Sequence, residues 1–147
     1  MSQGRRTSRR QAVFALYQRD LLDLTTEAAL ERATGPELDA YTRDLVSGTA
    51  AEQEAIDRTI QSHLAGWSLE RLGIVERSIL RLATYELLWE AGVPEAVVID
   101  EAVELAKRFC SDEAGALING ILGSIAGSEG ERIRGIRKDQ RDSKVAR

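Results

Sequence analysis

The chain has 147 residues, 43% of them hydrophobic, and a formal net charge of −4 at pH 7. That length suits one domain with a hydrophobic core and is too short for two large ones. The single cysteine, Cys110, excludes an intramolecular disulfide framework, and the longest apolar run, residues 12–17, is far shorter than the ~20 residues that span a bilayer. We therefore expect a cytoplasmic protein with no membrane association.

The charges are distributed unevenly along the chain. Residues 1–19 carry five arginines and no acid, and residues 129–147 carry seven basic residues and four acidic ones. Between them, residues 20–128 carry eight basic residues and 20 acidic ones. An acidic body with two basic ends suggests that the ends contact a polyanion, while the body contacts something else, such as a basic protein.

The first predicted helix covers residues 7–22, where an arginine-rich turn leads into an apolar stretch. Thr7 or Ser8 is suited to cap its N-terminus, since short hydroxyl side chains accept hydrogen bonds from free backbone N–H groups. A shorter helix fits residues 26–33.

A longer helical segment begins at Pro36, because proline is favoured in the first turn of a helix. Its apolar residues mark one face as far as Leu64. The apolar pattern weakens around Gly48, so the segment is either one helix bent near that glycine or two helices.

The second half of the chain has the clearest helical periodicity. One helix is predicted within residues 69–90, a second begins at Pro94, and Ser111 caps a third. Apolar residues recur in the last two at offsets of 3 or 4, 7, 8 and 11, as in an amphipathic helix. No stretch alternates as a strand does, so the sequence predicts an all-α bundle.

The apolar periodicity ends after Ala126. Residues 127–147 mix glycine with basic, acidic and hydroxyl residues. We therefore predict a helical domain over residues 1–126 and a mostly disordered basic tail over residues 127–147.

Groups that could catalyse a reaction are scarce. The one histidine, His63, and the one cysteine, Cys110, fall on different predicted helices, and no spacing identifies them as a pair. The sequence has no ligand set for zinc and no phosphate-binding glycine motif. We expect a protein that is not an enzyme and that needs no cofactor or metal.

The informative residues are the N-terminal arginines. Arg5, Arg6, Arg9 and Arg10 stand where the dipole of a helix favours acids, so their positive charge calls for a polyanion. The guanidinium group forms paired hydrogen bonds to phosphate and stacks on bases. This pattern favours binding of RNA or DNA over the alternative of a solvated charged helix start.

Two further features allow two interpretations each. Glu86 lies near an apolar face, either as a boundary residue turned to water or as an acidic contact for a basic partner. A line of small residues along the last helix predicts the close approach of another backbone, with a ligand backbone as the less favoured alternative; its members are Ala116, Gly120, Gly123 and Gly127.

Three stretches resemble the NusB transcription-antitermination family. They are Arg6-x-x-Arg9-x-x-Ala12-x-x-x-Leu16-Tyr17, the sequence VERSILRLATYEL at residues 75–87 with its continuation through residues 93–107, and LINGIL at residues 117–122. The similarity extends over roughly residues 5–126. The continuation to residue 107 together with the Asn-Gly-Ile-Leu motif is the most specific part.

The resemblance implies a NusB-like bundle of about seven helices in two small subdomains. It also implies binding of single-stranded boxA-type RNA of ribosomal operon leaders together with the ribosomal protein NusE. In that family the complex includes NusA, NusG and RNA polymerase, and it makes the polymerase resistant to termination.

Carried over by motif, the resemblance assigns RNA contacts to the N-terminal arginines and a NusE contact to Glu86. Leu117 departs from the family pattern, which often has an aromatic residue near the RNA at this position. Glu113, one turn earlier, remains a candidate RNA contact. The candidate RNA-binding residues are thus Arg5, Arg6, Arg9, Arg10 and Glu113.

Two questions stay open at this level. A similar helical domain is fused to RNA cytosine methyltransferases, so the alternative function is a stand-alone RNA-docking module. The sequence also leaves open whether the protein is a monomer or a homodimer.

Overall fold

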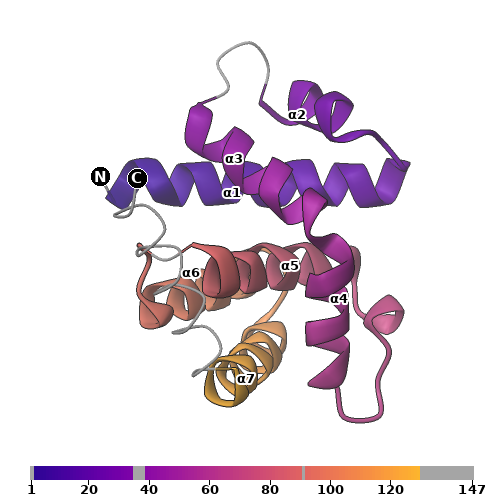
Figure 1. Ribbon diagram of the computed structural model, residues 1–147, viewed down its shortest axis with the longest axis vertical. Coiled ribbons are helices and arrows are strands. Elements are labelled where there is room, and N and C mark those ends of the chain that lie inside the picture. Colours follow the sequence, from indigo (N-terminus) through magenta and orange to yellow (C-terminus); the bar gives the residue numbers. More distant parts are fainter. Residues whose placement is uncertain (1, 35–38, 91, 130–147) are drawn as a thin grey trace, which may run out of the picture.

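The computed structural model describes residues 2–34, 39–90 and 92–129, and within them it contains helices and no strand (Figure 1). The helices are α1 (Ser2–Leu22), α2 (Thr26–Thr34), α3 (Ala40–Ala51), α4 (Gln53–Ser62), the short 3-10 helix η2 (Leu69–Arg71), α5 (Ile74–Trp89), α6 (Glu95–Phe109) and α7 (Asp112–Ser128). The predicted all-α bundle of about seven helices is confirmed. The predicted tail lies outside the described residues, apart from its first three residues, and the predicted domain boundary falls inside α7.

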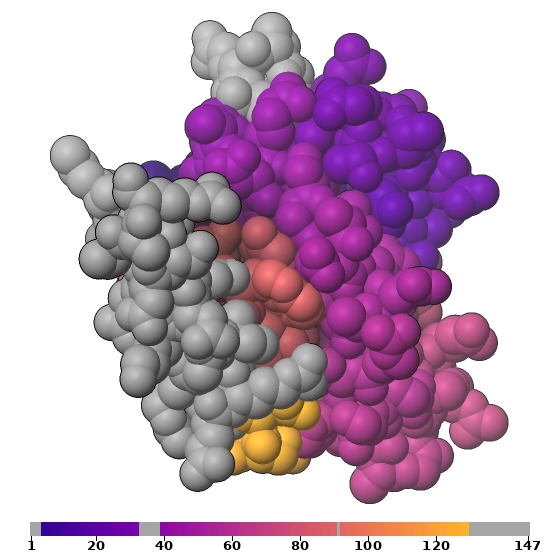
Figure 2. All heavy atoms as spheres, viewed as in Figure 1, coloured from indigo at the N-terminus to yellow at the C-terminus, as the bar shows by residue number. Residues whose placement is uncertain are grey.

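The helices form two groups. In Figure 1, α2 and α3 pack on α1, while α5, α6 and α7 lie together below them with α4 at their side. Helix α5 connects the groups because it contacts α1 and α3 as well as α4, α6 and α7. The residues of α3 and α4 form a continuous band down the face of the molecule shown in Figure 2.

One cluster of buried aliphatic side chains extends through both groups. Burying apolar surface is the main favourable contribution to folding, at about 25 cal/mol per Å². The stripes predicted for the last two helices supply much of this core: Val98, Ala102, Ala106, Ala114, Ile118, Ile121, Leu122 and Ile125 are all buried.

Helix α1 begins at Ser2, so neither Thr7 nor Ser8 caps it, and that prediction is wrong. Ser8 instead lies inside the helix, where its hydroxyl oxygen is 3.1 Å from Asp39 Oδ2. Asp39 is the N-cap of α3 and accepts a hydrogen bond from the Thr42 backbone N–H at 2.7 Å. This carboxylate therefore joins the N-terminal part of α1 to the start of α3.

The segment predicted to start at Pro36 contains two helices, with the break at Glu52 and not at Gly48. Pro36 itself lies outside the described residues. Gly48 has a packing role, because a Cβ atom there would overlap the ring of Tyr85 on α5. The weak apolar pattern at Gly48 thus marks a close contact between helices.

The last two helices begin as predicted, at Pro94 and at Ser111. Pro94 is the N-cap residue of α6, and the Ser111 hydroxyl accepts a hydrogen bond from the Ala114 N–H at 3.0 Å. The prediction of a close backbone neighbour along α7 is wrong for the glycines at 120, 123 and 127. A Cβ atom at each of these would meet no described atom within 4 Å, because this line of the helix is exposed.

Replacing Asp39 with alanine should destabilise the protein by about 1 kcal/mol at pH 7, within the range of 0.5–2 for loss of an N-cap. Burial by itself would raise the pKa of Asp39. The hydrogen bonds from Thr42 and Ser8 together lower it by a larger amount, so the folded-state pKa is below its ordinary value. The stabilisation is therefore present above the unfolded-state pKa of about 3.9 and is lost as the pH falls through the folded-state value.

Urea unfolding of the wild type and of Asp39→Ala across pH 2–7 measures this effect. The difference in unfolding free energy should shrink below about pH 4. Asp44→Ala, an exposed position on the same helix, is the control and should change stability little. A difference that stays constant across the pH range would contradict the capping role.

Candidate functional site

The four N-terminal arginines point in different directions around α1. Successive residues of an α-helix are rotated by about 100°, so Arg6 and Arg10 share one side and Arg5 lies on the other side of Arg9. The structure places Arg9 inside the protein and leaves Arg5 and Arg6 exposed, with Arg10 half-buried.

Arg9 forms a buried ion pair with Glu86 of α5. Its Nε atom lies 2.9 Å from Glu86 Oε1 and 3.1 Å from Oε2, and the two side chains are only 5% and 2% exposed. The Tyr41 hydroxyl of α3 donates to Glu86 Oε1 at 3.3 Å. Burial raises the pKa of Glu86 above its ordinary value, although Arg9 and Tyr41 oppose the shift.

This arrangement corrects the positions expected for Arg9 and Glu86. Glu86 was predicted at a boundary, where it could meet a partner, and Arg9 was predicted on the exposed cationic face. Both are buried, because each supplies the opposite charge that the other needs in order to leave water. In this conformation neither side chain is accessible to RNA or to another protein.

The other arginines lie on two sides of the buried pair. The Arg5 guanidinium lies over the Tyr41 ring, 5.3 Å from its centroid. The Arg6 Nε atom is 2.9 Å from Glu101 Oε1 of α6 in an ion pair whose arginine side chain is 66% exposed. Such an exposed pair contributes at most about 1 kcal/mol, so Arg6 can exchange Glu101 for a phosphate at little cost.

A groove of about 560 Å³ separates α1 from α6, and we call it the α1–α6 groove. Three arginines contribute to its walls, Arg6 and Arg10 from α1 and Arg108 from α6. Within the described part of the chain, Arg10 and Arg108 form no ion pair. The remaining lining residues are Thr7, Glu101, Glu104 and Leu105.

Sequence reasoning missed Arg108 and two phenylalanines beside this groove. Phe14 of α1 and Phe109 of α6 are 41% and 38% exposed, and their rings meet edge to face with centroids 5.3 Å apart. The Arg108 guanidinium lies 5.5 Å from the Phe109 ring centroid. The spacing of four residues from Arg10 to Phe14 places the two side chains on one face of α1, and this was the available signal in the sequence. The contact of Phe14 with Phe109 of α6 could not be predicted from it.

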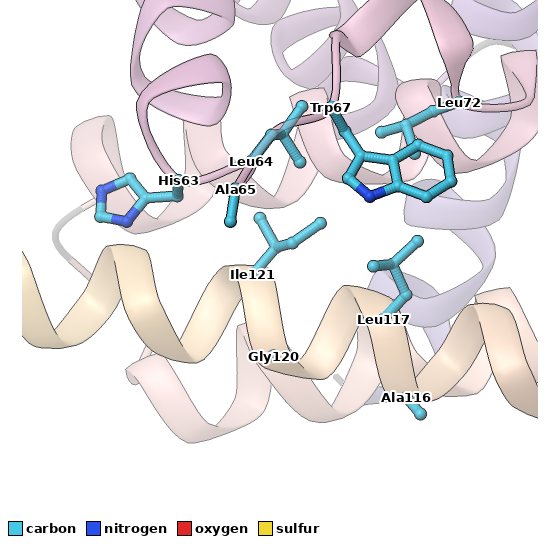
Figure 3. Close-up of a pocket in the computed structure, with 9 residues that line it drawn as sticks. All are labelled: His63, Leu64, Ala65, Trp67, Leu72, Ala116, Leu117, Gly120 and Ile121. Atoms are coloured by element: carbon cyan, nitrogen blue, oxygen red, sulfur yellow. The ribbon is translucent and has the colours of Figure 1, made fainter.

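Glu113 is exposed in the first turn of α7, and it is not part of the α1–α6 groove. Leu117, one turn further on, lines a second groove of about 470 Å³ between α7 and the segment after α4 (Figure 3). Trp67 and Leu117 face one another there, 59% and 45% exposed, and Gly120 lies along the groove floor. This second groove is lined almost wholly by apolar side chains.

The two residues considered for nucleophilic chemistry have other neighbours. His63 Nδ1 lies 2.9 Å from the Ser124 hydroxyl oxygen, and Nε2 lies 3.1 Å from that of Ser128. Burial and the nearby Glu76 raise the pKa of the Cys110 thiol to about 11, so it is protonated at neutral pH and a poor nucleophile.

Among residues 2–34, 39–90 and 92–129, no group of three or more His, Cys, Asp or Glu side chains could hold a metal ion. In the same part of the chain, no helix has both the length and the apolar character needed to cross a bilayer.

Comparison with known proteins gives consistent matches. The model of the NusB family matches residues 6–127. The chain is 48% identical to the transcription antitermination protein NusB of Halalkalibacterium halodurans, over 81% of this chain and 90% of that protein. It is 42% identical to the protein of the same name from Bacillus subtilis, over 82% and 93% of the two chains.

Solved structures agree with this result. NusB from T. maritima superposes with a TM-score of 0.77 at 39% identity, covering 84% of this chain and 90% of that one. A crystal structure of the antitermination factors NusB and NusE in complex with double-stranded RNA superposes with a TM-score of 0.79 at 30% identity, covering 87% and 99%.

Replacing Arg9 with alanine should destabilise the protein by about 3–5 kcal/mol, because it leaves the Glu86 carboxylate buried without a cation. The loss of Arg9 raises the pKa of Glu86 further, so the destabilisation should diminish as the pH falls through that raised value and the carboxyl group becomes neutral. Thermal and urea unfolding between pH 4 and pH 8 measure both effects.

The controls separate the ion pair from simple loss of an arginine. Arg10→Ala, on the same turn, should change stability by less than about 1 kcal/mol. The double variant with leucine at positions 9 and 86 should be more stable than Arg9→Ala, because it buries no charge. An Arg9→Ala protein as stable as the wild type would show that the pair contributes nothing.

Proposed function

The chain belongs to the NusB family, and on that premise we propose that it is a transcription antitermination factor that binds boxA-type RNA of ribosomal operon leaders together with the ribosomal protein NusE. The observation that carries the proposal is the cationic end of α1, where Arg5, Arg6 and Arg10 lie around the buried Arg9. Phosphate groups account for most of the affinity of such surfaces for nucleic acid.

The geometry supports different roles for the arginines. Arg5, Arg6 and Arg10 have guanidinium groups that can reach phosphate without unfolding the helix, since two are exposed and one lines the α1–α6 groove. Arg9 is a positioning residue, because its pair with Glu86 fixes how far α1 is rotated. Glu113 is exposed and remains a candidate acceptor for hydrogen bonds from base edges or 2′-hydroxyl groups.

A basic protein partner is supported by two facts. Residues 20–128 carry 20 acidic residues and eight basic ones, and a structure similar to this chain is described as NusB with NusE and RNA. We assign the NusE contact to exposed carboxylates within residues 20–128. Glu86 contributes only by holding Arg9, and with it α1, in position. NusA, NusG and RNA polymerase are then the further members of the proposed complex.

Replacing Arg5, Arg6 and Arg10 with alanine together should weaken binding of single-stranded boxA-type RNA and reduce its dependence on salt. Each phosphate contact to a single strand contributes about 0.7 to the slope of log affinity against log salt concentration, so three lost contacts flatten the slope by about 2. Alanine favours helix, so the fold should persist. Fluorescence anisotropy between 50 and 300 mM salt measures the slope.

The matched control removes three exposed arginines elsewhere on the body, Arg32, Arg58 and Arg71. It has the same net charge as the first variant and should retain most of the wild-type slope. Equal losses in the two variants would show that only total charge matters and would contradict an RNA site on α1. Scrambled single strands and duplex RNA of the same length measure specificity.

A transcription assay with purified polymerase tests the function itself. Read-through of a terminator should increase with the wild-type chain, NusE, NusA and NusG on a template that carries boxA, and it should not increase with the triple variant. RNA binding without any effect on read-through would favour the alternative, a stand-alone RNA-docking module.

A further inference from the structure

We propose that the exposed pair Phe14 and Phe109 is a base-stacking site at the end of the α1–α6 groove, where a single-stranded RNA placed by the arginines stacks a base on the aromatic rings. The inference rests on the proposed RNA-binding function and adds a subsite to it. It is carried by the exposure of the two rings and by their position next to three arginines.

The groove has a contact between the two helices at each end. Arg6 meets Glu101 at one end, and Phe14 meets Phe109 at the other. The two contacts are separated by eight residues on each helix, about 12 Å at 1.5 Å per residue. A strand lying in this groove therefore passes from exposed cations to exposed aromatic rings.

The exposure of the pair is not explained by packing. Val13 and Ala15 beside Phe14 are buried in the core, as is Ala106 one turn before Phe109, whereas the two rings keep about two fifths of their surface in water. Exposing an aromatic ring costs the free energy that its burial would contribute. Base stacking recovers this contribution, because each base offers an apolar face of similar size.

The charges around the pair select nucleic acid as its occupant. Arg108 lies 5.5 Å from the Phe109 ring centroid, and Arg10 precedes Phe14 by one helical turn. Glu101 and Glu104 also line the groove, and Glu101 is already paired with Arg6. Cations beside an exposed aromatic ring fit a strand whose phosphates and bases alternate, and this is how single-stranded nucleic acid is held without sequence-specific hydrogen bonds.

The test compares Phe14→Leu and Phe109→Leu with Phe14→Tyr and Phe109→Tyr in the full chain, with and without NusE. The probe is a labelled single-stranded RNA of about 12 nucleotides from a ribosomal operon leader. Each leucine variant should lose about tenfold or more in affinity, as expected for one lost stacking contact, and the tyrosine variants should keep most of it. The salt slope should stay unchanged, since no phosphate contact is removed.

A second measurement locates the base. Single abasic sites placed along the RNA should include one that weakens binding to the wild type but causes no further loss in the leucine variants, because both changes remove the same contact. Leu21→Ala, an exposed apolar position on the same helix, is the positional control and should bind as the wild type does. Thermal unfolding establishes that each variant is folded.

The outcomes separate this inference from the function on which it rests. Wild-type chain that binds no RNA in a salt-dependent way would contradict the proposed function. Salt-dependent binding by the wild type with undiminished affinity in both leucine variants would overturn the stacking site alone. Leucine variants that lose NusE or self-association but keep RNA would assign the pair to a protein interface and would also overturn it.

Discussion

The buried ion pair between Arg9 and Glu86 sets the geometry of the whole cationic end of the molecule. It takes one charge from α1 and one from α5, and Tyr41 of α3 donates a further hydrogen bond to the carboxylate. Removing two charges from water is costly, and the mutual attraction of the pair together with the hydrogen bond from Tyr41 offsets that cost. Once Arg9 points inward, the helical rotation of about 100° per residue determines where every neighbouring arginine points.

A second set of ion pairs holds the other end of the same helix. Asp20 of α1 meets Arg77 and Arg81 of α5 at 2.9 and 3.1 Å, and Arg81 also contacts Asp57 of α4. Helix α1 is thus attached to α5 through Arg9 near its N-terminus and through Asp20 near its C-terminus. Ion pairs near both ends oppose a shift of α1 along α5 or a rotation about its axis.

These ion pairs between α1 and α5 hold several arginines close together, although their positive charges repel one another. The remaining arginines lie close together at a helix N-terminus, where the macrodipole already favours anions. Arg6 is partly neutralised by Glu101, and Arg5 lies against the Tyr41 ring. The residual positive potential is directed outward by a rigid helix, so a polyanion can bind without first ordering the groups that contact it.

The sequence by itself determined the local features: the helices, the caps at Pro94 and Ser111, the family and the separation of charge. The helices, the caps and the separation of charge follow from short-range periodicity and composition, which one chain segment carries alone. The family was indicated by the resemblance of three motifs. The tertiary structure decided which charged residues are buried. Arg9 and Arg10 are neighbours with the same side chain, and the carboxylate that pairs with Arg9 in the interior lies 77 residues further along the chain. The contact of Phe14 with Phe109 likewise depends on how α1 and α6 pack, because exposure is set by neighbours that are distant in the sequence.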